Sequence, residues 1–314
     1  MRFLIYRFLK MRKTYHREPE IPRDRQIPHN FKFHPVWRIV RKAFLSAIVP
    51  VLFLLFWHSL SLHVNNPIKL PTVAKTLDIL LNPLANVVGV GSILRNTYVS
   101  LMRVLFGYAA AAVVAVPLGV LIGYSRTAKQ MLLPFLNFFR SIPPMSLVPL
   151  ALAWFGIASL ASLLGLKLTQ PGFIILNNMR ISMLAIIFFG SFFPILSSAI
   201  FGVESVRKTL IDSVRSMGAN PVQQITKVYL PHAMPSIFTG LQVGLGTAWM
   251  VLICAEMLPG SIAGVGYMIS HAYQVARIDV VIAGIISISV VGALLQAVFL
   301  IIESFRFRWK NQGK

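Results

Sequence analysis

Long apolar runs alternate with short polar segments along most of this chain. Six of the runs approach the roughly twenty residues that an α-helix needs to cross a bilayer. They are Ala43–Leu62, Ser100–Ile122, Met131–Phe155, Ile181–Phe201, Ile237–Leu258 and Val281–Ile302. The pattern predicts an all-α polytopic membrane protein with six transmembrane helices.

The third of these runs is interrupted by residues that disfavour a straight helix. It contains Arg140, Pro143, Pro144 and Pro149. Prolines are tolerated at membrane depth where neighbouring helices satisfy the freed carbonyl groups. We therefore expect a broken helix that other helices enclose.

Composition supports the membrane interpretation. Hydrophobic residues make up 56% of the 314 residues and charged residues only 12%, whereas about a quarter of a soluble domain is charged. The formal net charge of +21 is compatible with nucleic-acid binding, but the chain carries no motif of a nucleic-acid-binding fold. Basic cytoplasmic loops explain the same charge, so no nucleic-acid partner is expected.

The distribution of Lys and Arg predicts the orientation. With a cytoplasmic N-terminus, 22 of the 30 basic residues fall in cytoplasmic segments and 6 in outer ones, as the positive-inside rule requires. Both termini are then cytoplasmic. Residues 1–42 form a basic tail attracted to anionic lipid headgroups, with a short amphipathic helix over residues 1–13. Residues 43–304 form the transmembrane domain, and residues 305–314 form a second basic tail.

Motifs for catalysis and cofactor binding are missing from the sequence. There is no Walker A motif for ATP, no HExxH or GxSxG motif and no Cys/His cluster at metal-binding spacing, and Cys254 is the single cysteine. We therefore predict a non-catalytic chain without a metal or cofactor of its own. The pairs Gly119–Gly123 and Gly240–Gly244 have the GxxxG spacing that is typical of close helix packing.

Three charged residues fall within or at the edge of apolar runs, and such residues are candidates for a substrate pathway. Glu256 lies near the outer end of the fifth run. It either serves the pathway or has a structural role, hydrated at the interface or paired with a basic residue such as Arg180 or Arg277. Arg140 and Arg103 are further pathway candidates, although pairing inside the bundle or snorkelling explains an arginine better.

The polar segment between the fourth and fifth runs predicts two linked cytoplasmic helices. From Ser205 to Met217, apolar residues recur at three and four positions along one face, and Gly218 is suited to the left-handed turn that ends a helix. Asn220, Pro221 and Gln223 then have the pattern of a capping box. A second helix is expected to end at Pro231. Such a pair can insert into a groove of a soluble partner.

This segment resembles the cytoplasmic Glu-Ala-Ala signature of ATP-binding-cassette (ABC) importer permeases. The glycine, the aliphatic residue and the Leu-Pro pair of that signature correspond to Gly218, Val228 and Leu230–Pro231. The triplet itself departs from the family pattern, because Asp212, Ser213 and Val214 occupy it. The residues that the resemblance assigns to ATPase coupling are Asp212, Ser213, Val214, Gly218, Ala219, Asn220, Pro221, Leu230 and Pro231.

The resemblance extends from about Ile93 to the C-terminus through RNTYVSLMRVLFGY, PLGVLIGYS, FRSIPPMSLVPLALAWFGI and FFGSFFPIL. These stretches are similar to the nitrate, sulfonate, taurine and bicarbonate branch of the permeases. Residues 158–180 are an insertion relative to that branch and are expected on the outer side.

The resemblance implies a type I (MetI-like) importer permease in the inner or plasma membrane. Two copies, as a homodimer, would enclose the path of a small anion. ABC ATPase subunits, which alone bind ATP and Mg²⁺, would grip residues 205–230, and an extracytoplasmic solute-binding protein would deliver the solute. Two alternatives remain open: a stand-alone secondary transporter or channel that uses Glu256, and a membrane scaffold without transport.

Overall fold

The computed structural model describes residues 35–167, 169–170, 172–258 and 260–306, and its regular elements in these ranges are helices. Contacts divide the chain into residues 1–56 and residues 57–314, which are described separately. The described part of the first unit is the beginning of helix α2 (Pro35–Val64), which continues into the second unit. The amphipathic helix predicted over residues 1–13 lies outside the described residues.

The predicted spans are present among the described residues. Five helical segments are long and apolar enough to cross a membrane, and a bent pair makes a sixth if it is counted as one span. The five are α2, α4 (Ile93–Tyr124), α9 (Ile181–Glu204), the joined segment Pro221–Met257 and α14 (Ile278–Arg306). The predicted helical fold is thus confirmed, and the predicted number of six spans agrees with the structure when the bent pair is counted as one span.

The expected break in the third span is confirmed. Helix α5 (Arg126–Arg140) is followed by the short 3₁₀ helix η1 (Pro144–Leu147) and by α6 (Val148–Phe155), and the two halves meet at 83°. Pro143 between them has extended backbone angles, φ −60° and ψ 128°. A residue that precedes a proline is disfavoured in the helical region, so Pro144 directs the break to this position.

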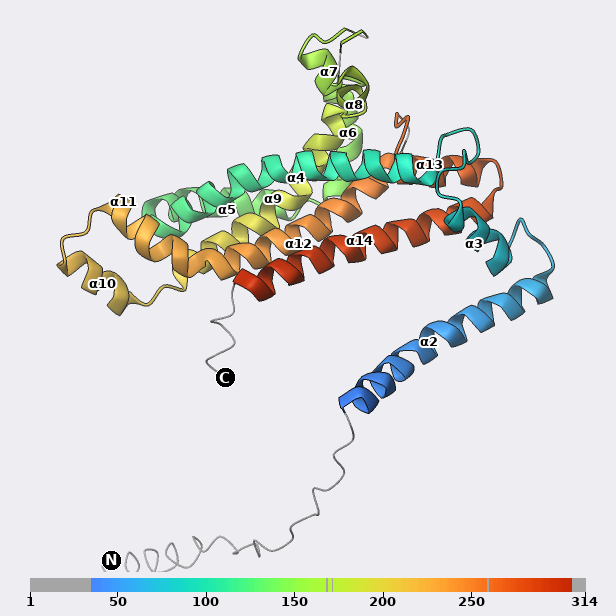
Figure 1. The fold of residues 1–314 in the computed structure, drawn as a ribbon. Coiled ribbons are helices and arrows are strands. Elements are labelled where there is room, and N and C mark those ends of the chain that lie inside the picture. The colour runs from blue at the N-terminus through green and yellow to red at the C-terminus, as the bar shows by residue number, and fades with distance from the viewer. Residues whose placement is uncertain (1–34, 168, 171, 259, 307–314) are drawn as a thin grey trace, which may run out of the picture. The chain divides into compact units, whose positions relative to one another are not determined.

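Helix α9 is the centre of the second unit. It packs along α4 on one side and along α12 (Leu230–Met257) on the other, and Figure 1 shows α4, α9, α12 and α14 running side by side. Tyr108 of α4 donates a hydrogen bond to the carbonyl of Leu241 in α12 at 3.0 Å. These three helices therefore form one tightly connected core.

Glycines bring the backbones of this core together. A Cβ atom at Gly119 or Gly123 of α4 would meet Ala199 or Val203 of α9, and one at Gly240 or Gly244 of α12 would meet Ser198 or Ile195 of the same helix. The two GxxxG pairs thus face α9 from opposite partners. This confirms their interpretation as close-packing motifs.

Shorter helices flank the core. Helix α3 (Val73–Leu81) and helix α13 (Val265–Gln274) both pack against α14. Trp249 of α12 donates a hydrogen bond to the carbonyl of Ile288 in α14 at 3.3 Å. The insertion contains α7 (Leu160–Leu163) and α8 (Phe173–Asn177), and backbone hydrogen bonds close its two ends, from Leu160 to Met179 and from Ile181 to Ala158.

The polar segment differs from its prediction in one important respect. Helix α10 (Lys208–Ser216) and helix α11 (Pro221–Gln224) are present, but no helix ends at Pro231. The chain continues through a π-helical turn, η2 (Ile225–Tyr229), directly into α12. A proline clashes with the carbonyl four residues earlier in a regular helix, and the wider π turn just before Pro231 relieves that conflict.

We predict that Gly240→Ala lowers the thermal stability of the purified protein, because the added methyl group would overlap Ser198 of α9. Overpacking of this kind costs about 1–3 kcal/mol. Gly246→Ala in the same helix is the matched control, because a Cβ atom there meets nothing within 4 Å. Unfolding monitored in detergent should show a lower midpoint for the first variant alone; equal midpoints would contradict the close packing.

Candidate functional site

The turn between α10 and α11 is built from local hydrogen bonds. Gly218 adopts φ +77°, its N–H donates to the carbonyl of Arg215, and the N–H of Ala219 donates to that of Val214. This is the Schellman pattern of a helix C-terminus. Asn220 and Gln223 then exchange reciprocal side-chain to backbone hydrogen bonds of 2.8 and 3.0 Å. The predicted turn and capping box are both confirmed.

The helix pair presents apolar side chains to its surroundings. Leu210 is 46% exposed, Met217 85% and Val222 68%. Around them, Asp212 and Ser213 of the signature triplet are also exposed, while Val214 is half-buried. Exposed apolar residues rimmed by polar ones are typical of an interaction surface. We name this candidate interaction surface, comprising Leu210, Met217 and Val222, the docking face.

The other side of the pair is anchored to the core. Val206 and Tyr229 are buried, and Ile211 packs in the same cluster. The Tyr229 ring meets that of Tyr124, the last residue of α4, edge to face at a centroid distance of 5.2 Å. Residues Leu230 and Pro231 begin the long helix α12. The helix pair is therefore in contact with α4 and continuous with α12.

At the opposite end of α12, Glu256 and Arg103 form a buried ion pair. Arg103 Nη1 lies 2.7 Å from Glu256 Oε1, and both side chains are 0% exposed. Arg103 also donates to the backbone carbonyls of Asn178 and Ala263, at 2.8 and 2.7 Å. The pair thus connects α4, α12, the end of the insertion and the loop before α13.

The loop before α13 adapts closely to this ion pair. Ser100 donates to Glu256 at 2.8–2.9 Å and accepts from the N–H of Val265 at 2.9 Å. Gly266 N–H donates to Glu256 Oε2 at 3.1 Å. Gly264, with φ +118°, touches the Glu256 carboxylate where a Cβ atom would be, so a side chain has no room there. Asn96 completes the contact by accepting from the Gly264 N–H at 2.9 Å.

The structure decides between the two structural alternatives for Glu256: it is paired with a basic residue and is not hydrated at an interface. The pairing inside the bundle expected for Arg103 is confirmed; the partner of Glu256 is thus Arg103 rather than Arg180 or Arg277, the two examples expected from the sequence. Arg277 instead pairs with Asp279 at 2.9 Å. Asn96, Ser100, Gly264 and Gly266 were not singled out from the sequence. The Gly-Val-Gly stretch at 264–266 is the one local signal for them, because two nearby glycines indicate a close backbone approach. A pathway role for Glu256 and Arg103 stays a prediction.

Arg140 lies elsewhere, at the break of the third span. It is exposed, and its Nη1 donates to Ser197 Oγ of α9 at 3.4 Å. It lines an open cavity of about 510 Å³ between the break, α9 and α12. The three charged candidates are thus divided between a sealed ion pair and an accessible cavity.

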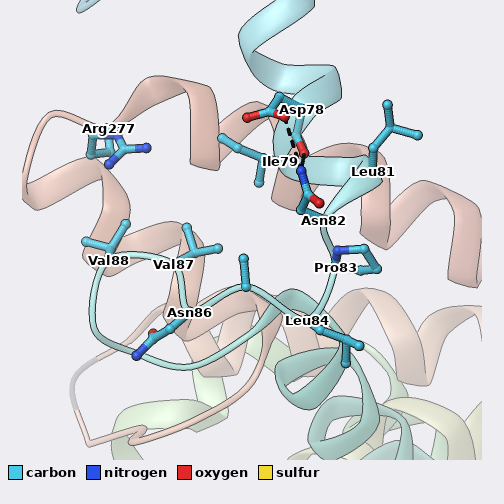
Figure 2. A pocket seen from close by; sticks show the side chains of 11 residues that line it. Asp78, Ile79, Leu81, Asn82, Pro83, Leu84, Asn86, Val87, Val88 and Arg277 are labelled. Atoms are coloured by element: carbon cyan, nitrogen blue, oxygen red, sulfur yellow. Dashed lines mark hydrogen bonds between the residues drawn. The ribbon is translucent and has the colours of Figure 1, made fainter.

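A further hollow, of about 450 Å³, lies between α3, the following loop and Arg277 (Figure 2). Asn82 donates to the carboxylate of Asp78 and Gly91 to the side chain of Asn86, so these polar groups already have partners. Among the described residues, no group of three His, Cys, Asp or Glu side chains could hold a metal ion.

We predict that Glu256→Gln lowers stability strongly, because it leaves the Arg103 guanidinium buried without a counter-charge. Breaking one side of such a pair costs about 3–5 kcal/mol. The double variant Glu256→Gln/Arg103→Met should recover much of that loss, since no unpaired charge remains. Thermal unfolding of both single variants and the double variant measures the coupling; additive losses would contradict the ion pair.

Comparison with known proteins identifies the family to which this chain belongs. Residues 115–307 match the family described as the inner membrane component of binding-protein-dependent transport systems. A putative ABC transporter permease protein of Methanocaldococcus jannaschii is 40% identical over 270 residues, 86% of this chain and 93% of that protein. The taurine transport system permease protein of Escherichia coli is 31% identical over 263 residues, 83% of this chain and 87% of its own length.

A nitrate import permease protein of Synechocystis is 29% identical over 284 residues, which cover 90% of this chain and 94% of that protein. Among solved structures, a chain of the MetNI methionine ABC transporter aligns with a TM-score of 0.53 at 20% identity, covering 67% of this chain and 94% of that one. This likeness concerns the fold. The chain belongs to the family of inner membrane components of binding-protein-dependent transport systems, the multi-pass permeases of ABC importers.

Proposed function

We propose that this permease forms the membrane path of an importer for a small anion and that an ABC ATPase drives it through residues 205–230. The observation that carries the proposal is the helix pair α10–α11. It exposes an apolar docking face and is anchored to the core on its other side. A helical surface of this kind fits a groove in a soluble partner.

The connection from the helix pair to the span supports coupling. Because α11 continues through η2 into α12, Pro221–Met257 forms one helical segment of 37 residues. Force applied to the docking face then acts on a membrane span without passing through a flexible loop. The contact between Tyr124 and Tyr229 joins α4 to the same motion.

The remaining partners are proposed from the relatives. Permeases for taurine, sulfonates, nitrate and bicarbonate are among them, which favours a small anion as the solute. We further propose a homodimer, an extracytoplasmic solute-binding protein that docks near residues 158–180, and ATP with Mg²⁺ held by the ATPase alone. Arg140 is the pathway candidate that an open cavity reaches, whereas Glu256 and Arg103 are enclosed.

The alternative of a secondary transporter or channel through Glu256 gains little support. The carboxylate accepts hydrogen bonds from Ser100, Arg103 and Gly266, and it is fully buried. A coupling residue must be reachable by its ion in at least one state. Uptake that proceeds with an ion gradient and without an associated ATPase would establish this alternative.

We predict that a P-loop ATPase co-purifies with the wild-type chain in mild detergent and that Met217→Asp weakens this association at least about tenfold, because burying an unpaired carboxylate at an apolar contact is costly. Met217 is 85% exposed, so the isolated fold should be unaffected. Leu84→Asp is the matched control, since Leu84 is 76% exposed but lies on the predicted outer side. If Met217→Asp and Leu84→Asp recover equal amounts of the ATPase, the docking face does not bind the ATPase.

We predict that Gly218→Val uncouples ATP hydrolysis from uptake. A β-branched residue disfavours φ +77°, and left-handed backbone costs a residue other than glycine about 1–2 kcal/mol. No atom lies within 4 Å of a Cβ there, so the effect is one of backbone conformation. Gly218→Asn is the control, because asparagine tolerates this conformation. ATP hydrolysis and solute uptake are both measured in proteoliposomes. The ratio of solute taken up to ATP hydrolysed should fall with valine and be kept with asparagine.

A further inference from the structure

The cavity beside Arg140 combines a single charge with an otherwise uncharged lining. Its walls come from the break after α5, from α9 and from α12, and no acidic residue lines it. Phe189, Phe193 and Val243 contribute apolar surface, and Ser197 and Ser198 contribute hydroxyl groups. The cavity therefore offers one positive charge and several hydroxyl groups on otherwise apolar walls.

Arg140 has no carboxylate partner in the described part of the chain. The ion pairs found there use Glu256, Glu204 and Asp279, each with another basic residue. The hydrogen bond from Arg140 to Ser197 is long, at 3.4 Å. A guanidinium offers five N–H donors, so most of its capacity is available. As the last residue of α5, Arg140 gains a modest stabilisation from the helix dipole, which does not replace a counter-ion.

The position of Arg140 makes an unpaired charge significant. Its partner Ser197 lies seven residues before Glu204, the end of α9, which is about 10 Å at the helical rise of 1.5 Å per residue. The Arg140 guanidinium therefore lies beside a residue of the α9 span rather than beyond the end of that helix. Charged residues within membrane-spanning segments usually face a water-filled path or a partner.

The neighbouring hydroxyls extend the polar surface. Ser198 makes no hydrogen bond to another described residue and lines the cavity next to Ser197. Thr247 of α12 donates to the carbonyl of Gly190 at 3.1 Å, the carbonyl that Pro194 leaves without a helical N–H partner. Thr247 and the Gly190 carbonyl thus satisfy each other, whereas the Arg140 guanidinium and the Ser198 hydroxyl have hydrogen-bonding capacity left for a ligand.

We infer that Arg140, together with Ser197 and Ser198, forms a binding subsite for a small oxyanion on the solute path. The planar guanidinium matches a nitrate, carboxylate or sulfonate group with two parallel hydrogen bonds, and the hydroxyls can donate to its remaining oxygen. This inference rests on the proposed function, because it places the cavity on the solute path. A lipid phosphate offers the same chemistry, and the experiment distinguishes the two sources.

Charged thiol reagents test the subsite without knowledge of the solute. Cys254, the single cysteine, is replaced by alanine, and Val243→Cys places one thiol in the cavity wall, where the native side chain is 52% exposed. The complete chain, purified with its partners, is treated with a sulfonate-bearing or a trimethylammonium-bearing methanethiosulfonate. The measured quantity is the rate of modification by the negative reagent divided by the rate for the positive reagent. This ratio should be about tenfold higher with Arg140 than with Arg140→Gln, because a fixed cation attracts the negative reagent and repels the positive one.

Matched variants and competitors make the result specific. Arg126→Gln, at the other end of α5 and outside this cavity, should leave the ratio unchanged, and Arg140→Lys should keep most of it. Nitrate should slow the negative reagent with Arg140 and have no effect with Arg140→Gln. Protection by added phosphatidylglycerol vesicles but not by nitrate would assign the site to lipid and overturn the inference.

The outcome is separable from that of the proposed function. If an ATPase co-purifies but the reagent ratio ignores residue 140, the importer proposal stands and the anion subsite is wrong. If the ratio and the nitrate protection depend on Arg140 while no ATPase associates, the anion site stands and the importer proposal is wrong. Size-exclusion profiles of the glutamine and lysine variants verify that both fold.

Discussion

The close packing of α9 between α4 and α12 is the constraint on which the rest of the structure depends. In lipid, apolar side chains gain nothing by leaving the solvent, so helices associate through close fit and hydrogen bonds instead. Glycines of α4 and α12 allow this fit because a side chain at these positions would overlap α9. The resulting register determines which residues meet at each end of the bundle and which line the cavity between them.

Charged groups inside the bundle show how surroundings decide a residue's role. Glu256 and Arg103 meet at one end of the core, where Ser100 and backbone N–H groups complete their hydrogen bonds. This network joins the loop before α13 to α4 and α12, although the buried Nη2 of Arg103 has no hydrogen-bond partner among the described residues. Arg140 is instead left with one long hydrogen bond beside an open cavity. One arginine, Arg103, is therefore engaged in an ion pair, whereas the other, Arg140, has donors available for a ligand.

The helix pair α10–α11 combines locally specified hydrogen bonds with a continuous helical connection to the span α12. Its turn is held by the Schellman and capping-box hydrogen bonds, which need no tertiary contact. Its link depends on the π-helical turn before Pro231, where the helix would otherwise break. Widened turns of this kind are frequent at functional positions. Helix α11 is therefore an extension of α12, and α10 is joined to it through the turn at Gly218.

The sequence by itself determined the number and approximate length of the spans, the break in the third span and the turn around Gly218. Each follows from a local rule: lipid requires helices of a given length, prolines remove N–H groups, and glycine tolerates positive φ. Only the tertiary structure decided that Glu256 pairs with Arg103, 153 positions away, and that the helix passes Pro231. Both depend on the rotation and register of packed helices, which no local pattern specifies, because they are set by the fit of α4 and α12 to α9.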